Sequence, residues 1–349
     1  MRTAGGSCCG ALVLAAILAG CGTSRPAAEP PPGAGPPSSR QRLEGFEISP
    51  RFGEQIRRYR VEPEVSVHVN APAAFDFDKP TRLILYALPN GNTTAQTIGC
   101  QPRAGLDWHY NIQHIGAQTR RLREVIADEN IVIAYLEADG RAWPAWKRRH
   151  EDYRVLIPRV VRSVRDQLPG PPAAIDLSGH SGGGSFILGY IDAAEAIPPE
   201  VRRIEFLDSN YGYSDEAGHG DKLVAWLKAR PDHCLSVICY DDREIELDGR
   251  KVVGPTGGTW RPTLRLLERL RKDFDLAEAP AKEAHRYRGL EGRIDVIMHP
   301  NPQNRILHTA LVGEMNGFIH ASTSGTRHEN VAGVFNGGVA YARWIQDGE

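Results

Sequence analysis

The amino-acid sequence predicts an α/β fold in which helices cover both faces of a mostly parallel central sheet. Apolar runs rich in β-branched residues alternate along the chain with stretches of helical periodicity, which is the order of crossover units. Most of these runs do not alternate between polar and apolar residues, as expected for strands that are buried on both faces. The 349 residues carry a formal net charge of -1, which gives no electrostatic reason to expect nucleic-acid binding.

The elements follow from these patterns in chain order. The apolar runs predict strands at residues 64–69, 81–88, 130–136, 174–178, 203–208, 234–240 and 306–312. Apolar residues at helical spacing predict helices at 107–128, 151–168 with a kink at Pro158, 221–230, 261–274 and within 329–347. Two strand-like runs around a Pro/Asn-rich turn predict a hairpin over 292–312, near the edge of the sheet.

The N-terminus has the pattern of an export signal. The apolar run from Ala11 to Ala19 is about ten residues long, which is too short to span a bilayer and suits a secretory signal. Leu18, Ala19, Gly20 and Cys21 together resemble the lipobox of bacterial lipoproteins, with a plain secretory signal as the alternative. The resemblance implies cleavage before Cys21, its lipidation, and a membrane-anchored protein of the cell envelope that faces the periplasm or the exterior.

The sequence divides into three parts. Residues 1–20 form the signal peptide, and residues 21–42 are rich in Pro, Gly, Ala and Ser and lack large apolar side chains. Such a segment cannot bury a core, so we expect a disordered tether. Residues 43–349 are then one folded domain.

The stretch "IDLSGHSGGGSF" predicts a nucleophile. A phosphate-binding P-loop would require a lysine that is absent, and the glycine spacing does not fit a dinucleotide fingerprint. Gly179, Ser181 and Gly183 instead match G-x-S-x-G between a strand and a helix, the nucleophile elbow of α/β hydrolases. Ser181 is the expected nucleophile, and the amide of Gly182 is an expected donor to the oxyanion.

An elbow of this kind requires an acid and then a histidine further along the chain. For the histidine, His320 is the first candidate because it lies in a Gly-containing loop after the last expected strand, and His308 and His299 remain as alternatives. For the acid, Asp242 follows the penultimate expected strand and is preferred over Asp208 and then Asp241.

Together these residues resemble the α/β-hydrolase superfamily over about residues 55–346. The turn Pro89-Asn90-Gly91-Asn92 is similar to the His-Gly turn of that superfamily, which implies the amide of Asn92 as the second oxyanion donor, with an ordinary β-turn as the alternative.

The resemblance implies a serine hydrolase that cleaves a carboxylic ester, or secondarily an amide, through a Ser-His-Asp triad and an acyl-enzyme. The substrate would be a small or polymeric ester. No cofactor is implied, and the sequence has neither HExxH nor CxxC to suggest a zinc enzyme. The alternative is a binding lipoprotein that keeps the α/β-hydrolase fold without catalysis.

Overall fold

The structure is a computed structural model that describes residues 42–103 and 111–345. The expected signal peptide, Cys21 and nearly all of the tether lie outside these residues. In the described part of the chain no helix is long and apolar enough to cross a membrane.

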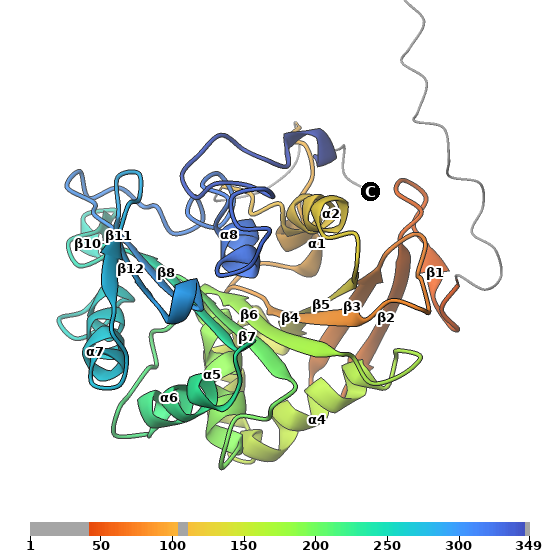
Figure 1. The fold of residues 1–349 in the computed structure, drawn as a ribbon, viewed down its shortest axis with the longest axis horizontal. Helices are drawn as coiled ribbons and strands as arrows, with labels where there is room; N and C mark the ends of the chain where they lie inside the picture. The colour runs from red at the N-terminus through yellow and green to blue at the C-terminus, as the bar shows by residue number, and fades with distance from the viewer. Residues whose placement is uncertain (1–41, 104–110, 346–349) are drawn as a thin grey trace, which may run out of the picture. The chain divides into compact units, whose positions relative to one another are not determined.

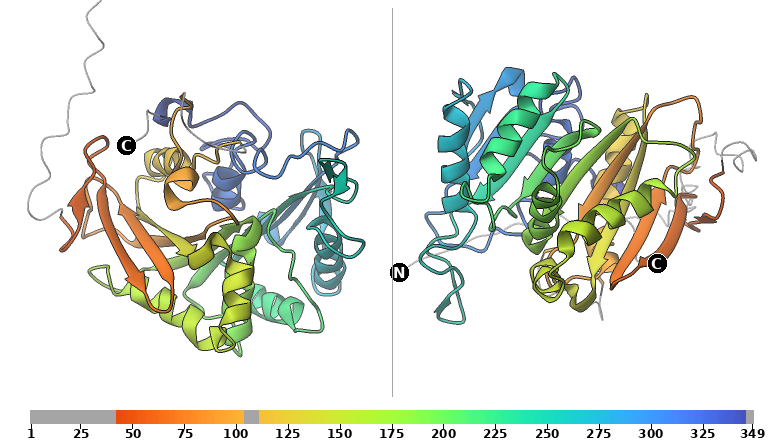
Figure 2. Two further views of the ribbon diagram at one scale, coloured as in Figure 1. Left: turned by 180° about the vertical axis from the view of Figure 1, so that it is seen from behind. Right: turned by 90° about the horizontal axis from the view of Figure 1, so that it is seen from below.

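One large sheet organises the fold (Figure 1). Its eleven strands lie in the order β1-β2-β3-β5-β4-β6-β7-β8-β13-β12-β11. The six strands from β5 to β13 in this order are parallel, and the strands outside them on both edges pair antiparallel. In Figure 2 the strands, coloured from orange to blue, form one continuous sheet. The predicted mostly parallel sheet is confirmed.

The bounds of the strands follow the apolar runs of the sequence. They are β1 (Glu47–Ile48), β2 (Gln55–Val61), β3 (Val65–Ala71), β4 (Thr81–Ala87), β5 (Asn130–Ala138), β6 (Ala174–His180), β7 (Val201–Leu207), β8 (Cys234–Tyr240), β11 (Ala277–Ala279), β12 (His285–Gly289) and β13 (Ile294–His299), with a separate two-stranded ribbon of β9 (Glu246–Leu247) and β10 (Arg250–Lys251).

Helices cover both faces of the sheet (Figure 1). One face carries α3 (Trp143–Arg149), α4 (Tyr153–Arg165), α5 (Gly184–Ala193), α6 (His219–Ala229) and α7 (Trp260–Arg271). The other carries α2 (Ile115–Val125) and α8 (Gly317–Thr323), with α1 (Thr94–Ile98) packed against α2. The alternation of β4 explains the two layers, because Leu83 and Leu85 enter one core while Ile84 and Tyr86 enter the other. The predicted α/β fold, with helices on both faces of a mostly parallel sheet, is thus confirmed.

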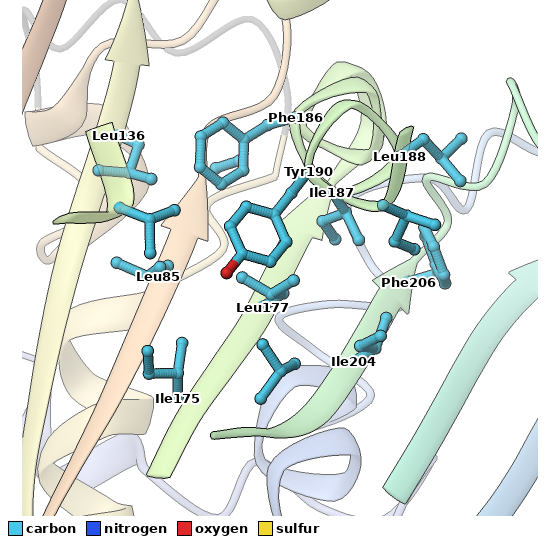
Figure 3. Packing of buried hydrophobic residues seen from close by; sticks show 14 of the residues in the cluster. Leu85, Leu136, Ile175, Leu177, Phe186, Ile187, Leu188, Tyr190, Ile204 and Phe206 are labelled. Atoms are coloured by element: carbon cyan, nitrogen blue, oxygen red, sulfur yellow. The ribbon is translucent and has the colours of Figure 1, made fainter. Parts of the chain in front are cut away.

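The packing of α5 fixes the position of the elbow (Figure 3). Phe186, Ile187 and Tyr190 of α5 belong to the same core as Leu177 of β6 and Phe206 of β7, and all five side chains are at most 7% exposed. Because α5 begins where β6 ends, this packing holds the start of the helix at the carboxyl edge of the sheet. That edge is where open parallel sheets place their ligands.

Two arginines of the sheet bind the end of α8, on the face of the sheet opposite to α5. Arg82 pairs with Asp176 (Nε to Oδ2, 2.6 Å) and donates to the carbonyl of Ser322 at 2.8 Å. Arg203 donates to the carbonyls of Ala321 and Ser324 at 2.8 and 2.9 Å. The two buried arginines therefore satisfy carbonyls at the end of α8 that have no partner within the helix.

Three predicted elements near the C-terminus are wrong. Residues 306–312 form turns, with a hydrogen bond from the amide of Leu311 to the carbonyl of Leu307 at 2.9 Å. The side chains of Leu307, Leu311 and Val312 pack on the α2/α8 side of the sheet. The predicted hairpin over 292–312 is absent, because β13 pairs with the preceding β12 and runs parallel to β8.

The third wrong element is the helix within 329–347, where the described residues contain only the 3-10 helix η5 (Ala342–Trp344). The side chain of Asn316 organises this segment instead. It donates to the carbonyls of Val334 and Gly338 and accepts from the amide of Ala340, all at 3.0 Å. The helix predicted over 107–128 begins only at Ile115 in the described residues, and residues 104–110 lie outside them.

Candidate active site

Ser181 lies at a sharp turn between strand and helix. Strand β6 ends at His180, the 3-10 helix η3 spans Ser181–Gly183, and α5 follows directly. Ser181 has a φ of 52°, a left-handed conformation that costs free energy for a residue with a Cβ. Such strain at a serine above the carboxyl edge of a sheet is the geometry that exposes its hydroxyl.

The glycines after Ser181 are required by close approach of other segments. A Cβ on Gly183 would lie 2.1 Å from the carbonyl oxygen of Ala87, at the end of β4. A Cβ on Gly184 would lie 1.7 Å from the carbonyl oxygen of Ser209. No side chain could be accommodated at these distances. The glycines therefore allow the turn after β6 to pack closely against the ends of the neighbouring strands β4 and β7.

His308 and Asp208 form a hydrogen-bonded pair beside the elbow. Nδ1 of His308 lies 2.5 Å from Oδ2 of Asp208, whose side chain is fully buried. A carboxylate only accepts, so Nδ1 carries the proton and Nε2 of the neutral ring is left as an acceptor. The other oxygen of Asp208 accepts from the hydroxyl of Thr259. His308 and Ser181 line the same cavity.

His180 contacts both the backbone and the ring of His308. Its Nε2 lies 3.1 Å from the backbone carbonyl of His308, and the two ring centroids are 4.3 Å apart. Because a carbonyl only accepts, Nε2 of His180 carries the proton. Burial, together with the neighbouring His308, holds the pKa of His180 well below its usual range, so this ring is neutral. His180 therefore fixes the backbone of His308.

Asp242 lies next to this pair and lines the cavity, but it is not the partner of His308 in the described contacts. Oδ2 of Asp242 accepts from the amide of Thr259 at 2.7 Å, while its Oδ1 is buried with no partner among the described residues. Burial and the charge of Asp208 raise the pKa of Asp242 to about 6. The third acid candidate, Asp241, pairs instead with Arg243.

His320, the first candidate for the histidine, does not line the cavity and belongs to a different cluster. It is 1% exposed, and its Nε2 lies 2.8 Å from Oδ2 of Asp295. Arg286 donates to both oxygens of the same carboxylate at 2.7 Å. Although burial acts in the opposite direction, hydrogen bonds from His320 and Arg286 hold the pKa of Asp295 at about 2. The structure thus corrects the expected pairing of His320 with Ser181 and Asp242.

The turn after β4 contributes a different residue from the one expected. Asn90 lines the cavity beside Ser181 and Gly182, whereas Asn92 is not among the lining residues. The amide of Gly91 donates to the carbonyl of Arg141 at 2.8 Å and is therefore engaged elsewhere. Of these two asparagines, Asn90 rather than the expected Asn92 therefore shares the cavity with Ser181.

The cavity has a volume of about 590 Å³. Large apolar side chains form much of its wall, and several of them are at least 42% exposed at its rim: Tyr211, Leu247, Val252 and Ile306. Polar residues appear at two places, around Ser181 and around Lys147, Asp192 and His219. A mostly apolar cavity with few polar groups is the usual form of a small-molecule site. Trp143 and Trp146 are buried in the core and are absent from the lining.

Sequence reasoning did not single out Lys147, Asp192 or His219. One signal was available, because Ser181, Ser185, Leu188 and Asp192 are spaced as one stripe of a helix that begins at the nucleophile. The described residues contain no group of three or more potential metal ligands.

No protein-family model and no curated protein sequence matches the chain. Among solved structures, a thermostable esterase is similar over 77% of this chain and 60% of its own length, at 11% identity and a TM-score of 0.44. A siderophore hydrolase from Aspergillus nidulans covers 78% of this chain and 95% of its own (12% identity, TM-score 0.40). A feruloyl esterase module from Clostridium thermocellum covers 81% and 97% (10% identity, TM-score 0.43). These likenesses are weak, and the chain spans less than two thirds of the thermostable esterase.

Proposed function

We propose that the chain is a serine hydrolase of the α/β-hydrolase superfamily that cleaves carboxylic esters through an acyl-enzyme. The nucleophile is Ser181, the base is His308 and the acid is Asp208. One observation carries the proposal: the paired imidazole of His308 lines the same cavity as Ser181, which lies at a strained strand-to-helix turn. Nucleophile, base and orienting acid are the three roles that acyl transfer requires.

The reaction follows from the donor and acceptor capacities of these groups. Oγ of Ser181 attacks the ester carbonyl while its proton passes to Nε2 of His308. The buried carboxylate of Asp208 holds the Nδ1 proton and stabilises the imidazolium. The amide of Gly182, with Asn90 as the second donor, stabilises the negative oxygen of the tetrahedral intermediate. The imidazolium then protonates the departing alcohol, and water hydrolyses the acyl-enzyme by the same route.

Hydrolysis of p-nitrophenyl acetate and p-nitrophenyl butyrate by the purified protein tests this proposal. We expect turnover that is lost in Ser181→Ala and reduced about 10⁴-fold in Asp208→Asn, since the amide would favour the wrong tautomer of the histidine. Well-folded wild-type protein that hydrolyses none of a panel of esters and amides would favour the non-catalytic binding lipoprotein instead.

We further propose that Cys21 is lipidated and that residues 21–42 tether the domain to a membrane of the bacterial cell envelope, facing the periplasm or the exterior. The lipobox-like tetrad that ends at Cys21 supports this location. Labelling of expressing bacteria with a palmitate analogue, followed by membrane fractionation, tests it. Label and membrane association should both disappear in Cys21→Ala, and a wild-type protein without label would contradict lipidation.

A further inference from the structure

The candidate active-site cavity extends along one face of α5. Ser181, Ser185, Leu188 and Asp192 all line it, at spacings of four, three and four residues. These spacings place the four side chains in one stripe of the helical segment formed by η3 and α5. Asp192 lies eleven positions after Ser181, so the stripe is about 16 Å long at 1.5 Å per residue.

The far end of the stripe is a cluster of polar side chains from four helices, α3, α4, α5 and α6. Asp192 of α5 accepts from Nε2 of His219 at 2.7 Å, at the start of α6. Its other oxygen accepts from the hydroxyl of Tyr153 at 3.1 Å and from Nζ of Lys147 at 3.4 Å. Lys147, Asp192 and His219 all line the cavity.

Most hydrogen-bonding groups of this cluster are already used by its own members. Both nitrogens of His219 are used, because Nδ1 accepts from the amide of Ser214 at 3.1 Å and Nε2 donates to Asp192. Although burial opposes it, the hydrogen bond from His219 and the charge of Lys147 hold the pKa of Asp192 at about 2, so Asp192 has no proton to donate.

Of the described side chains in this cluster, Lys147 alone keeps hydrogen-bond donors that are not used within the cluster. Its ammonium carries three donors, and among the described residues Asp192 is its one hydrogen-bond acceptor. The side chain is 19% exposed and its Nζ lies 4.3 Å from the ring centroid of Tyr153. Burial lowers the pKa of Lys147, although the charge and the hydrogen bond of Asp192 act in the opposite direction. An additional negative oxygen would supply the missing acceptor and charge.

We propose that the substrate is an ester with an apolar chain that ends in a carboxylate, and that Lys147 binds this carboxylate while Ser181 attacks the ester. This inference rests on the proposed hydrolase function and names its substrate class. Of the 16 Å stripe, roughly 3 Å at each end is taken by the contacts themselves. The remaining ~10 Å corresponds to about eight bonds of an extended chain at ~1.2 Å per bond.

Two pairs of esters test the substrate class, one for each half of the ester. In the acyl pair, the p-nitrophenyl monoester of nonanedioic acid is compared with p-nitrophenyl nonanoate. In the alcohol pair, the acetate ester of 7-hydroxyheptanoic acid, which also places eight bonds between the two carbonyl carbons, is compared with heptyl acetate. We expect the full-length protein to prefer the carboxylate member of one pair at least tenfold in kcat/KM. Lys147→Met should lower that ratio to about one, while Arg148→Met, at the neighbouring exposed position, should preserve it. A ratio of one or less in both pairs, or an unchanged ratio in Lys147→Met, overturns the proposal.

A binding measurement separates the subsite from the catalysis. Calorimetry on Ser181→Ala measures binding of the monomethyl ester of nonanedioic acid, which should weaken at least tenfold in Ser181→Ala/Lys147→Met. Equal binding by the two variants refutes the subsite, whether or not the wild-type protein hydrolyses esters. A different outcome is possible, in which the wild type hydrolyses no ester but binding still depends on Lys147. That outcome would refute the hydrolase function and leave the carboxylate site established.

Discussion

Replacement of Asp242 by asparagine should stabilise the protein, although the residue lies beside the proposed active site. Asp242 is 2% exposed, and burial together with the charge of Asp208 raises its pKa from 3.8 to about 6. A tenfold change in proton affinity corresponds to about 1.4 kcal/mol, so ionised Asp242 costs the folded state about 3 kcal/mol at neutral pH. An asparagine would keep an oxygen for the amide of Thr259, which now donates to Asp242 at 2.7 Å.

The sign of the pH dependence follows from the raised pKa. Below about pH 4 the carboxyl is protonated in both states, so it contributes no pH dependence. As the pH rises from about 4 to about 6, the unfolded chain releases this proton while the folded protein retains it, and the wild type loses stability. Above that window the full cost is present, and Asp242→Asn should exceed the wild type by about 1–3 kcal/mol.

Urea denaturation of both proteins between pH 4 and pH 8 measures this difference. The advantage of Asp242→Asn should grow across pH 4–6 and then stay constant. Asp241→Asn is the matched control, because a hydrogen bond from Arg243 lowers the pKa of Asp241 and its removal should cost stability at pH 7. An Asp242→Asn variant that is no more stable at pH 7, or whose advantage does not change with pH, would refute the electrostatic account of the paired carboxylates.

The two histidine candidates should differ in turnover. His308→Ala should lower kcat/KM for p-nitrophenyl acetate at least 10³-fold in an ester assay. In urea denaturation it should cost about 1–3 kcal/mol, because the buried carboxylate of Asp208 loses a hydrogen bond. His320→Ala should lower stability by about 1–3 kcal/mol because the buried carboxylate of Asp295 loses a hydrogen bond, with turnover retained in the protein that remains folded. Loss of turnover in folded His320→Ala, with normal turnover in His308→Ala, would reverse the assignment. Gly184→Ala should prevent folding or cost at least 3 kcal/mol by circular dichroism, whereas Gly170→Ala, with open space around its Cβ, should change stability by less than 1 kcal/mol. His180→Phe should keep a ring of similar size but lose the hydrogen bond to the backbone carbonyl of His308, so kcat should fall about tenfold. An unchanged kcat would refute the positioning role of His180.

The sequence predicted the sheet and the elbow well because both depend on local patterns. The strand before Ser181 and the helix after it are visible as apolar runs, and the glycine spacing predicts the turn between them. The same reasoning did not place His308 beside Ser181, because His308 lies in the apolar stretch 306–312, whose pattern predicts a strand. Leu307, Leu311 and Val312 of this stretch are buried by packing against the core while the backbone forms turns, and a pattern of apolar residues does not separate these two cases.

The choice between acids and between histidines depended on contacts that are distant in the sequence. His308 and Asp208 are 100 residues apart, and His320 and Asp295 are 25 apart. Both pairs join a histidine to a buried carboxylate, so residue type alone does not distinguish the proposed catalytic pair from the pair that supports α8. The distinction comes from the cavity, which Ser181 and His308 share and which His320 does not line.

Labelling with a fluorophosphonate probe tests the central claim most directly, because the probe reacts only with a serine whose hydroxyl is activated by its base. Wild-type protein and folded His320→Ala should label at Ser181, as located by mass spectrometry of the modified peptide. Ser181→Ala should not label, and His308→Ala should label at least 10³-fold more slowly. Undiminished labelling of His308→Ala, or no labelling of folded wild-type protein, would contradict the assignment of Ser181, His308 and Asp208 as the catalytic triad.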